Sequence, residues 1–240
     1  MVWFRKMIPI YVAALSLTLL LAVMASEGVT VFAGALELAE PSNRQIVILD
    51  PGHGGEDGGA VSPNGVLESA LNLEISLRLR DLLNFLGVPV QMTRETDCSI
   101  YSAEAQTVSE KKISDLKNRV RIVNEAPDAL LVSIHQNMFP ESKYYGTQVF
   151  YAETAGSQLL AESLQALFSS ELDPTNHRMA KRAQNVYLMN KIHHPGILVE
   201  CGFLSNPKEE QLLQNMDYQK KLAAVIAAGV STMLWSRTVS

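Results

Sequence analysis

The amino-acid sequence predicts an α/β fold: a twisted, mainly parallel sheet of about six strands with helices on both faces, preceded by an N-terminal hydrophobic helix. Two observations carry this prediction. Short apolar runs alternate along the chain with segments whose apolar residues recur every three or four positions, which is the spacing of an amphipathic helix. Several of the short runs are apolar throughout, as is typical of strands buried on both faces of a parallel sheet.

The short apolar runs are the candidate strands of the sheet. Runs of this length bounded by turn residues are typical of strands, and the helices between them supply the crossovers that parallel strands need. The expected strands are 46–49, 88–93, 129–135, 146–151, 185–189 and 196–201.

Amphipathic helices are expected between and after these strands. The first is stopped by Gly87 and Pro89, and Asp217 is the expected N-terminal cap of the last. Two longer stretches, 96–110 and 172–184, are expected to be irregular and to form a substrate rim. The expected apolar helix faces comprise Leu71, Ile75, Leu79, Leu82 and Leu86; Ile113, Leu116, Val120 and Val123; Leu160, Leu164 and Leu167; and Tyr218, Leu222, Val225, Ile226 and Met233.

Composition excludes several classes of protein. The 240 residues are 47% hydrophobic and 19% charged, which is typical of a globular chain and not of a disordered one. The formal net charge of −5 argues against a nucleic-acid binder, because such a protein needs a basic face. Two cysteines, Cys98 and Cys201, are too few for a disulfide-rich fold, and no CxxC spacing suggests a thiolate metal site.

The N-terminal segment differs from the rest of the chain. Arg5 and Lys6 precede an uncharged, apolar stretch at 7–26. As a helix this stretch would be about 30 Å long, enough to cross the hydrocarbon core of a bilayer. Basic residues before the apolar run favour export of the remainder of the chain. We therefore expect a signal peptide or membrane anchor at 1–26, a linker at 27–44 and one domain at 45–240. A buried core helix would normally have a polar face, which this stretch lacks.

Polar residues follow three of the buried strands, where ligands bind in sheets of this class. His53 follows the first strand, His135 ends the third and Glu200 lies in the last. Glu68 opens the first helix, and the start of that helix returns to the same edge of the sheet. Two imidazoles and one carboxylate, with a fourth position for water, are the ligands of a catalytic zinc ion. A second carboxylate there can take the proton of that water.

Taken singly, each of these residues also has a simpler interpretation. His53 could be a surface histidine in a glycine-rich turn, and Glu68 could interact only with the helix dipole. A buried neutral imidazole at His135 would also fit. Glu200 is the most informative, because a carboxylate in an apolar strand loses hydration unless it has a partner or a chemical role. The convergence of all four on one edge favours a metal site.

Several motifs resemble the zinc-dependent N-acetylmuramoyl-L-alanine amidases of the Amidase_3 family. They occur in the order found in that family, from about residue 45 to the C-terminus, so that the resemblance covers the whole exported domain. Within the family, an N-terminal hydrophobic segment with a bare catalytic domain is most similar to the germination-specific amidases of the spore cortex. The motifs are Ile48–Gly55, Glu68 with Asn72, Met92–Asp97, Arg119–Asn124, Ser133–Asn137 and Val199–Asn206.

This resemblance implies one Zn²⁺ ion held by His53, Glu68 and His135, with Glu200 as the catalytic glutamate. The implied reaction is hydrolysis of the amide between N-acetylmuramic acid and L-alanine of the stem peptide. Glu200 would accept a proton from water and deliver it to the departing nitrogen. Asn72 lies one helical step from Glu68, where it would either orient that carboxylate or remain solvated.

The resemblance also implies where the protein acts and with what. The expected partner is peptidoglycan, with the membrane contacted through residues 1–26 and no nucleic acid bound. The expected location is outside the cytoplasm, anchored to the membrane or secreted to the cell wall or spore cortex, in preparation for muramic-lactam formation and germination. No wall-binding repeat is visible, so the membrane segment or an activating or localising protein is expected to place the enzyme.

Two other functions use the same scaffold. One is a binding protein that is catalytically silent or depends on a partner, although such a protein has no need of Glu200. The other is a zinc peptidase that cuts within the stem peptide and shares every ligand.

The sequence alone does not decide the role of several other residues. We expect Cys201 to be a buried apolar residue and not a nucleophile. His193 and His194 either line the cleft or form a surface turn. A basic cluster, comprising Arg178, Lys181 and Arg182, either meets stem-peptide carboxylates or is a solvated loop.

Overall fold

The computed structural model describes residues 45–238, with side chains described up to residue 234, and these residues belong to one compact unit. The predicted membrane segment at 1–26 and linker at 27–44 lie outside the described residues. Among the described residues, no helix has the length and apolarity required to cross a membrane. The strands are β1 (Ile46–Pro51), β2 (Val90–Met92), β3 (Ala129–Asn137), β4 (Gln148–Tyr151), β5 (Lys181–Arg182) and β6 (Gly196–Phe203).

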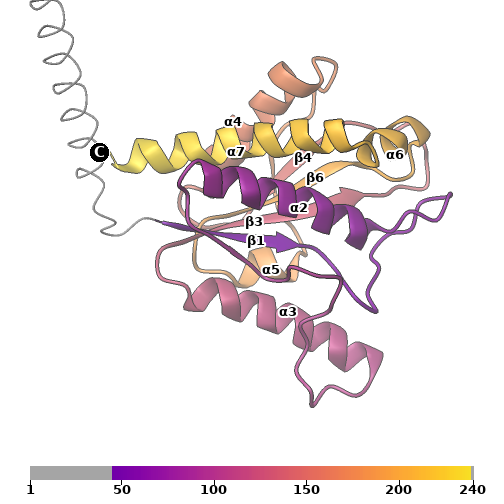
Figure 1. Cartoon of the computed structure of the whole chain (residues 1–240), viewed down its shortest axis with the longest axis vertical. Helices are drawn as coiled ribbons and strands as arrows, with labels where there is room; N and C mark the ends of the chain where they lie inside the picture. The colour runs from indigo at the N-terminus through magenta and orange to yellow at the C-terminus, as the bar shows by residue number, and fades with distance from the viewer. Residues whose placement is uncertain (1–44, 239–240) are drawn as a thin grey trace, which may run out of the picture. The chain divides into compact units, whose positions relative to one another are not determined.

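The helices cover the sheet on both faces, as the sequence predicted (Figure 1). One apolar core lies between the sheet and α2, α4 and α7, and the other between the sheet and α3 and α5. The helical elements are α2 (Glu68–Phe85), α3 (Val108–Glu125), α4 (Ser157–Leu167), the π-helical turn η1 (Phe168–Leu172), α5 (Tyr187–Lys191), α6 (Pro207–Leu213) and α7 (Met216–Thr238).

The sheet has six strands in the order β2-β1-β3-β6-β4-β5. The four strands β2, β1, β3 and β6 are parallel, whereas β4 pairs with β6 in the antiparallel direction and β5 runs parallel to β4. The sheet is therefore mixed. Its parallel part contains the three strands that carry the predicted site residues.

One predicted strand is wrong. Residues 185–189 were expected to extend the sheet, but Tyr187–Lys191 form the helix α5 instead. Asn185 has a left-handed backbone with φ of 59°, and this turn interrupts an extended path. Leu188 and Ile192 then lie one helical turn apart, and both are buried against the sheet. A short apolar run is compatible with either periodicity, and here burial follows the helical one.

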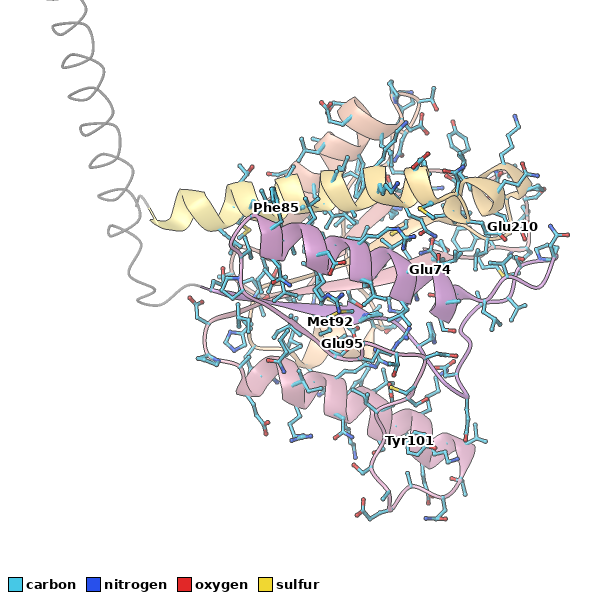
Figure 2. The ribbon with its side chains drawn as sticks, in the orientation of Figure 1. Glu74, Phe85, Met92, Glu95, Tyr101 and Glu210 are labelled. Atoms are coloured by element: carbon cyan, nitrogen blue, oxygen red, sulfur yellow. The ribbon has the colours of Figure 1, made fainter. Side chains whose placement is uncertain are left out.

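The sixth strand instead lies within a stretch that was expected to be irregular. β5 has only two residues, Lys181 and Arg182, both exposed at the edge of the sheet. The other irregular stretch, at 96–110, has no regular element until α3 begins at Val108. Tyr101 lies on this segment beside α3 (Figure 2), where Nζ of Lys111 is 5.0 Å from the centre of its ring.

The predicted cap of the last helix is also wrong. The side chain of Asn215, and not that of Asp217, accepts hydrogen bonds from the first backbone N–H groups of α7. Asp217 lies inside the first turn, where Lys220 holds the pKa of its carboxyl group below the usual value. The preceding helix α6 was not expected, although Asn206 caps it and Pro207 begins it.

Candidate metal centre

The four predicted site residues lie at the carboxyl edge of the parallel strands. His53 follows β1, His135 lies near the end of β3 and Glu200 lies in β6. Glu68 is the first residue of α2, which returns to the same edge. The structure therefore brings together residues from four elements that are far apart along the chain.

Three of these side chains form a cluster with the geometry of a metal site. One potential ligand atom from each of His53, Glu68 and His135 lies within 4.8 Å of the other two. Nε2 of His53 is 3.4 Å from one Glu68 oxygen, and Nδ1 of His135 is 2.9 Å from the other. Two imidazole nitrogens and one carboxylate fit a divalent cation such as zinc, with room for a fourth ligand.

Two glycines leave the space that this cluster requires. A Cβ atom on Gly52 would lie 2.2 Å from Cε1 of His135. A Cβ atom on Gly59 would lie 2.6 Å from Oε2 of Glu68 and 2.8 Å from Cδ2 of His53. Any side chain at these two positions would therefore displace the cluster.

Glu200 lies directly beside this cluster. It is the register partner of His135 on the neighbouring parallel strand. Its Oε2 atom is shielded from solvent and has no hydrogen-bond partner among the described residues. Burial raises the pKa of the Glu200 carboxyl group to about 7, against the opposing effect of His135. A carboxyl group poised near neutral pH is suited to take up and release a proton.

The imidazoles and carboxylates of the cluster stabilise one another in their charged forms. Burial lowers the pKa of His53, but the adjacent carboxylates of Glu68 and Asp57 outweigh it and raise that pKa to about 9. Burial likewise raises the pKa of Glu68, but the imidazoles of His135 and His53 hold it well below the usual range. Without a metal ion, the buried carboxylate is therefore charged and pairs with a protonated imidazole.

A carboxylate that was not predicted from the sequence fixes the His53 ring. Asp57 Oδ2 lies 2.9 Å from Nδ1 of His53, so that Nε2 faces Glu68. Asp57 also accepts a hydrogen bond of 3.2 Å from the backbone N–H of Gly59. Such carboxylate–imidazole contacts fix the tautomer and orientation of histidine ligands. The i, i+4 spacing of His53 and Asp57 in a glycine-rich loop is the sequence signal that could have identified it.

Two buried arginines hold the loop that carries His53. Arg94 donates hydrogen bonds to the backbone carbonyls of Pro51, Gly52, Thr96 and Ser69. Arg119 donates to the carbonyl of His53 at 2.8 Å and to Asp50 Oδ1 at 2.6 Å. His53 itself has a φ of 62°, an unfavourable conformation for a non-glycine residue, and these bonds oppose its relaxation. Both arginines belong to the sequence motifs, but their role was not predicted.

Glu68 is held by a network of buried amides. Asn72 Nδ2 donates to Glu68 Oε1 at 3.3 Å, so that of the two interpretations of Asn72 the structure favours the one in which it orients this carboxylate. Gln136 donates its backbone N–H to the same oxygen at 3.1 Å and its side-chain amide to Asn72. The backbone N–H of Ala60 donates to the other Glu68 oxygen at 2.8 Å.

The remaining candidates lie outside the cluster. Cys201 is fully buried in the apolar core, as predicted, and both cysteines are free. His193 and His194 precede β6 at the opposite edge of the sheet, and His193 is exposed, as in the surface-turn interpretation. The basic cluster divides: Lys181 and Arg182 lie on β5, whereas Arg178 lines a separate pocket.

Comparisons with known proteins agree with this architecture. Residues 47–232 match the family model Amidase_3, N-acetylmuramoyl-L-alanine amidase. The chain is 41% identical over 191 residues to the germination-specific N-acetylmuramoyl-L-alanine amidase of Bacillus subtilis (strain 168), covering 79% of this chain and 80% of that protein.

Two amidases of known structure have the same fold. The CwlD amidase from Clostridioides difficile, solved in complex with the GerS lipoprotein, is 40% identical with a TM-score of 0.77, covering 80% of this chain and 99% of that one. An N-acetylmuramoyl-L-alanine amidase from Clostridium difficile 630 is 32% identical with a TM-score of 0.71, covering 81% and 99%. The chain therefore belongs to the Amidase_3 family of N-acetylmuramoyl-L-alanine amidases.

Proposed function

We propose that His53, Glu68 and His135 hold one zinc ion and that Glu200 transfers the proton during hydrolysis of the amide between N-acetylmuramic acid and L-alanine. One observation carries this proposal. Three ligand atoms lie within 4.8 Å of one another, beside a glutamate whose buried Oε2 atom has no partner among the described residues. Zinc bound there would polarise the amide carbonyl and acidify a coordinated water.

The protein's own side chains would transfer the proton and hold the zinc ligands in place. Glu200 accepts the proton of the attacking water and delivers it to the departing L-alanine nitrogen. Asp57 holds His53 with Nε2 toward the centre, and Asn72 and Gln136 hold the carboxylate of Glu68. In the metal-free site burial raises the pKa of Glu200 to about 7, toward the range in which a carboxyl group both takes up and releases a proton.

The test is analysis of the products released from purified peptidoglycan by the zinc-loaded protein. An amidase frees the lactyl carboxylate of muramic acid and the amino group of L-alanine. A zinc peptidase with the same ligands would instead release free terminal D-alanine or a fragment of the stem. Mass spectrometry of the products distinguishes the two, and release of stem fragments alone would overturn the amidase assignment.

We further propose that the protein acts on spore cortex, before formation of muramic lactam. Its 41% identity to a germination-specific amidase supports this, because the similarity extends over 80% of that protein. The test is deletion of the gene followed by muropeptide analysis of the cortex, with the wild-type chain and Glu200→Gln reintroduced. Cortex that keeps its muramic lactam after deletion would exclude this role.

A partner protein and export through residues 1–26 complete the proposal. A CwlD amidase that is 40% identical has been solved with a lipoprotein bound, which supports an activating or localising partner here. The test compares turnover of the purified protein with and without candidate lipoproteins from the same spore. Full turnover without any addition would exclude an obligatory activator. To test export, Arg5 and Lys6 are replaced, and cell fractionation then shows whether the protein still leaves the cytoplasm.

A further inference from the structure

A second pocket lies outside the metal centre, between the connection from β3 to β4 and the segment after η1. Its volume is about 230 Å³. We call it the cationic pocket, because Lys143 and Arg178 line it and no acidic side chain does. Its lining comprises Lys143, Tyr144, Tyr145, Thr175, Asn176, His177 and Arg178. Two cationic side chains, Lys143 and Arg178, thus line one pocket of a chain whose formal net charge is −5.

The walls of the cationic pocket are fixed by buried hydrogen bonds. Asn176 is only 2% exposed, and its Nδ2 donates to the backbone carbonyl and the hydroxyl of Thr147 at 2.9 and 3.0 Å. Its Oδ1 accepts from the backbone N–H of Arg178 at 3.1 Å. Gly146 has a φ of +90°, and a Cβ atom there would lie 2.9 Å from the Asn176 side chain. The two loops are therefore locked together around the pocket.

Arg178 is held in place but has no ion-pair partner. Its Nε donates to the backbone carbonyl of Tyr145 at 2.7 Å, and its guanidinium lies 4.5 Å from the centre of the Phe203 ring. Among the described residues no carboxylate forms an ion pair with it, although its charge opposes the rise that burial causes in the pKa of the nearby Glu209 carboxyl group. A guanidinium that is already ordered by an aromatic ring and a carbonyl loses little further conformational entropy when it binds an anion.

The cationic pocket lies beyond the carboxyl end of β6, the strand that carries Glu200. Phe203 ends β6 three residues after Glu200, which corresponds to about 10 Å along a strand. Phe139 follows His135 by four residues, and its ring contacts those of Phe203 and Tyr144 at centroid distances of 5.4 and 5.2 Å. The three rings of Phe139, Tyr144 and Phe203 therefore form one aromatic cluster beyond the ends of β3 and β6, and Arg178 packs against its Phe203 ring.

We propose that the cationic pocket binds a free carboxylate of the stem peptide through Arg178, while the scissile amide lies at the metal centre. This proposal rests on the proposed amidase function. Phe203, against which Arg178 packs, lies about 10 Å along β6 from Glu200, and about three residues of an extended peptide cover that span, so a carboxylate on one of the first stem residues fits this position. A planar guanidinium matches the two oxygens of a carboxylate. Lys143, whose Nζ lies over the Tyr144 ring, adds a second positive charge.

The test compares two N-acetylmuramoyl-L-alanyl dipeptides whose second residue has its γ-carboxyl group capped as the N-methylamide and its α-carboxyl group either free (D-glutamate) or amidated (D-isoglutamine). We expect the zinc-loaded wild-type chain to have a KM about tenfold lower for the carboxylate substrate, with similar kcat. Arg178→Gln should remove this preference and leave the amide substrate unchanged. The matched control is Arg182→Gln, because Arg182 is an exposed arginine on β5 that pairs with Glu153 outside the pocket. It should keep the preference.

The outcomes separate this proposal from the amidase assignment. Two results would show that the pocket does not bind this carboxylate, provided that both substrates are hydrolysed. Either the wild type hydrolyses both with the same KM, or Arg178→Gln keeps the lower KM for the carboxylate substrate. If neither is hydrolysed, calorimetric binding of both dipeptides to the Glu200→Gln chain decides, and equal affinities overturn the proposal. Should Arg178→Gln not fold, Arg178→Lys keeps the charge without the planar fork. A folded lysine variant with the full wild-type preference would then contradict the bidentate contact.

Discussion

His135 and Glu200 are register partners on the neighbouring parallel strands β3 and β6. Residues paired in this way lie about 4.8 Å apart, and their side chains leave the same face of the sheet. The hydrogen bonds of the sheet therefore place two groups side by side: the His135 imidazole of the candidate metal site and the Glu200 carboxyl group, whose Oε2 has no partner among the described residues. Replacement of either side chain should leave the other in position.

Glu200→Gln should abolish hydrolysis and leave the metal site intact. Glutamine has nearly the same shape but cannot accept the proton of water, so we expect turnover to fall by about 10²–10⁴-fold. Zinc content should remain at one ion per chain, because Glu200 is not among the three clustered ligands. The measurement is muropeptide release together with metal analysis of the same sample.

The control for this variant is Glu162→Gln, an exposed residue on α4. It should have wild-type turnover and wild-type zinc content. Full activity in Glu200→Gln would remove Glu200 from its proposed role. Loss of zinc in that variant would instead make Glu200 a ligand.

Zinc binding should release about one proton at pH 7. His53 has a pKa of about 9 in the metal-free cluster and must lose its proton to bind zinc. Apparent zinc affinity should therefore rise about tenfold per pH unit from 7 to 9 and then level off. Calorimetry in buffers of different ionisation enthalpy measures the released proton, and an enthalpy independent of the buffer would contradict this prediction.

The raised pKa of His53 also affects the stability of the metal-free fold. Because the folded pKa lies above the unfolded value of 6.5, this histidine stabilises the fold fully below pH 6.5. The contribution should disappear as the pH rises through about 9. Urea unfolding of the zinc-free protein at pH 6.5 and 9.5 measures it, and equal free energies of unfolding would refute it.

Asp57→Asn should weaken zinc binding without removing a ligand. The substitution removes the negative charge beside Nδ1 of His53, and changes of this kind cost about 10–100-fold in metal affinity. Asp57→Ala should cost at least as much, because it also removes the acceptor for the Gly59 N–H. Competition with a chromogenic chelator measures the affinity.

The adjacent Glu56 is the natural control for Asp57. It is exposed and pairs with Lys111, not with a ligand. Glu56→Gln should bind zinc like the wild type. If Asp57→Asn and Glu56→Gln had the same affinity, Asp57 would have no part in positioning His53.

The sequence predicted the parts of the fold that depend on periodicity. Long helices and buried strands such as β3 repeat their apolar residues often enough to be recognised. The apolar run at 185–189 was too short to show a period. The left-handed backbone of Asn185, which precedes the helix α5, cannot be read from a hydrophobic pattern. β5 could not be found because its two residues are exposed, so no burial pattern marks them.

The site was predicted in part for a similar reason. His53, His135 and Glu200 follow or occupy apolar strands, so the topology of the sheet brings them to one edge. Gln136 acts through hydrogen bonds to Glu68 and Asn72 that depend on the folded geometry, whereas the only sequence signal for Asp57 was its i, i+4 spacing from His53. The chemical type of a residue and its position relative to a strand were enough to predict the clustered residues, but not the residues that hold them in place.

Arg119→Met should destabilise the fold strongly. Arg119 Nη1 donates to Asp50 Oδ1 at 2.6 Å, and the two side chains are 3% and 1% exposed. Removal of the guanidinium would leave a buried carboxylate without its ion-pair partner, which typically costs about 3–5 kcal/mol. The hydrogen bond to the carbonyl of His53 would be lost as well, so that zinc affinity should also fall. Chemical denaturation measures the free energy of unfolding.

Arg121 on the same helix provides the matched comparison. Its pair with Glu125 is 3.5 Å long, and both side chains are at least 60% exposed. Arg121→Met should therefore change the free energy of unfolding by no more than about 1 kcal/mol, since solvent screens such pairs. In the double variant Asp50→Asn, Arg119→Met the unpaired charge is gone, so part of the stability should return. Equal losses in Arg119→Met and Arg121→Met would show that burial of the Asp50 charge does not determine the effect.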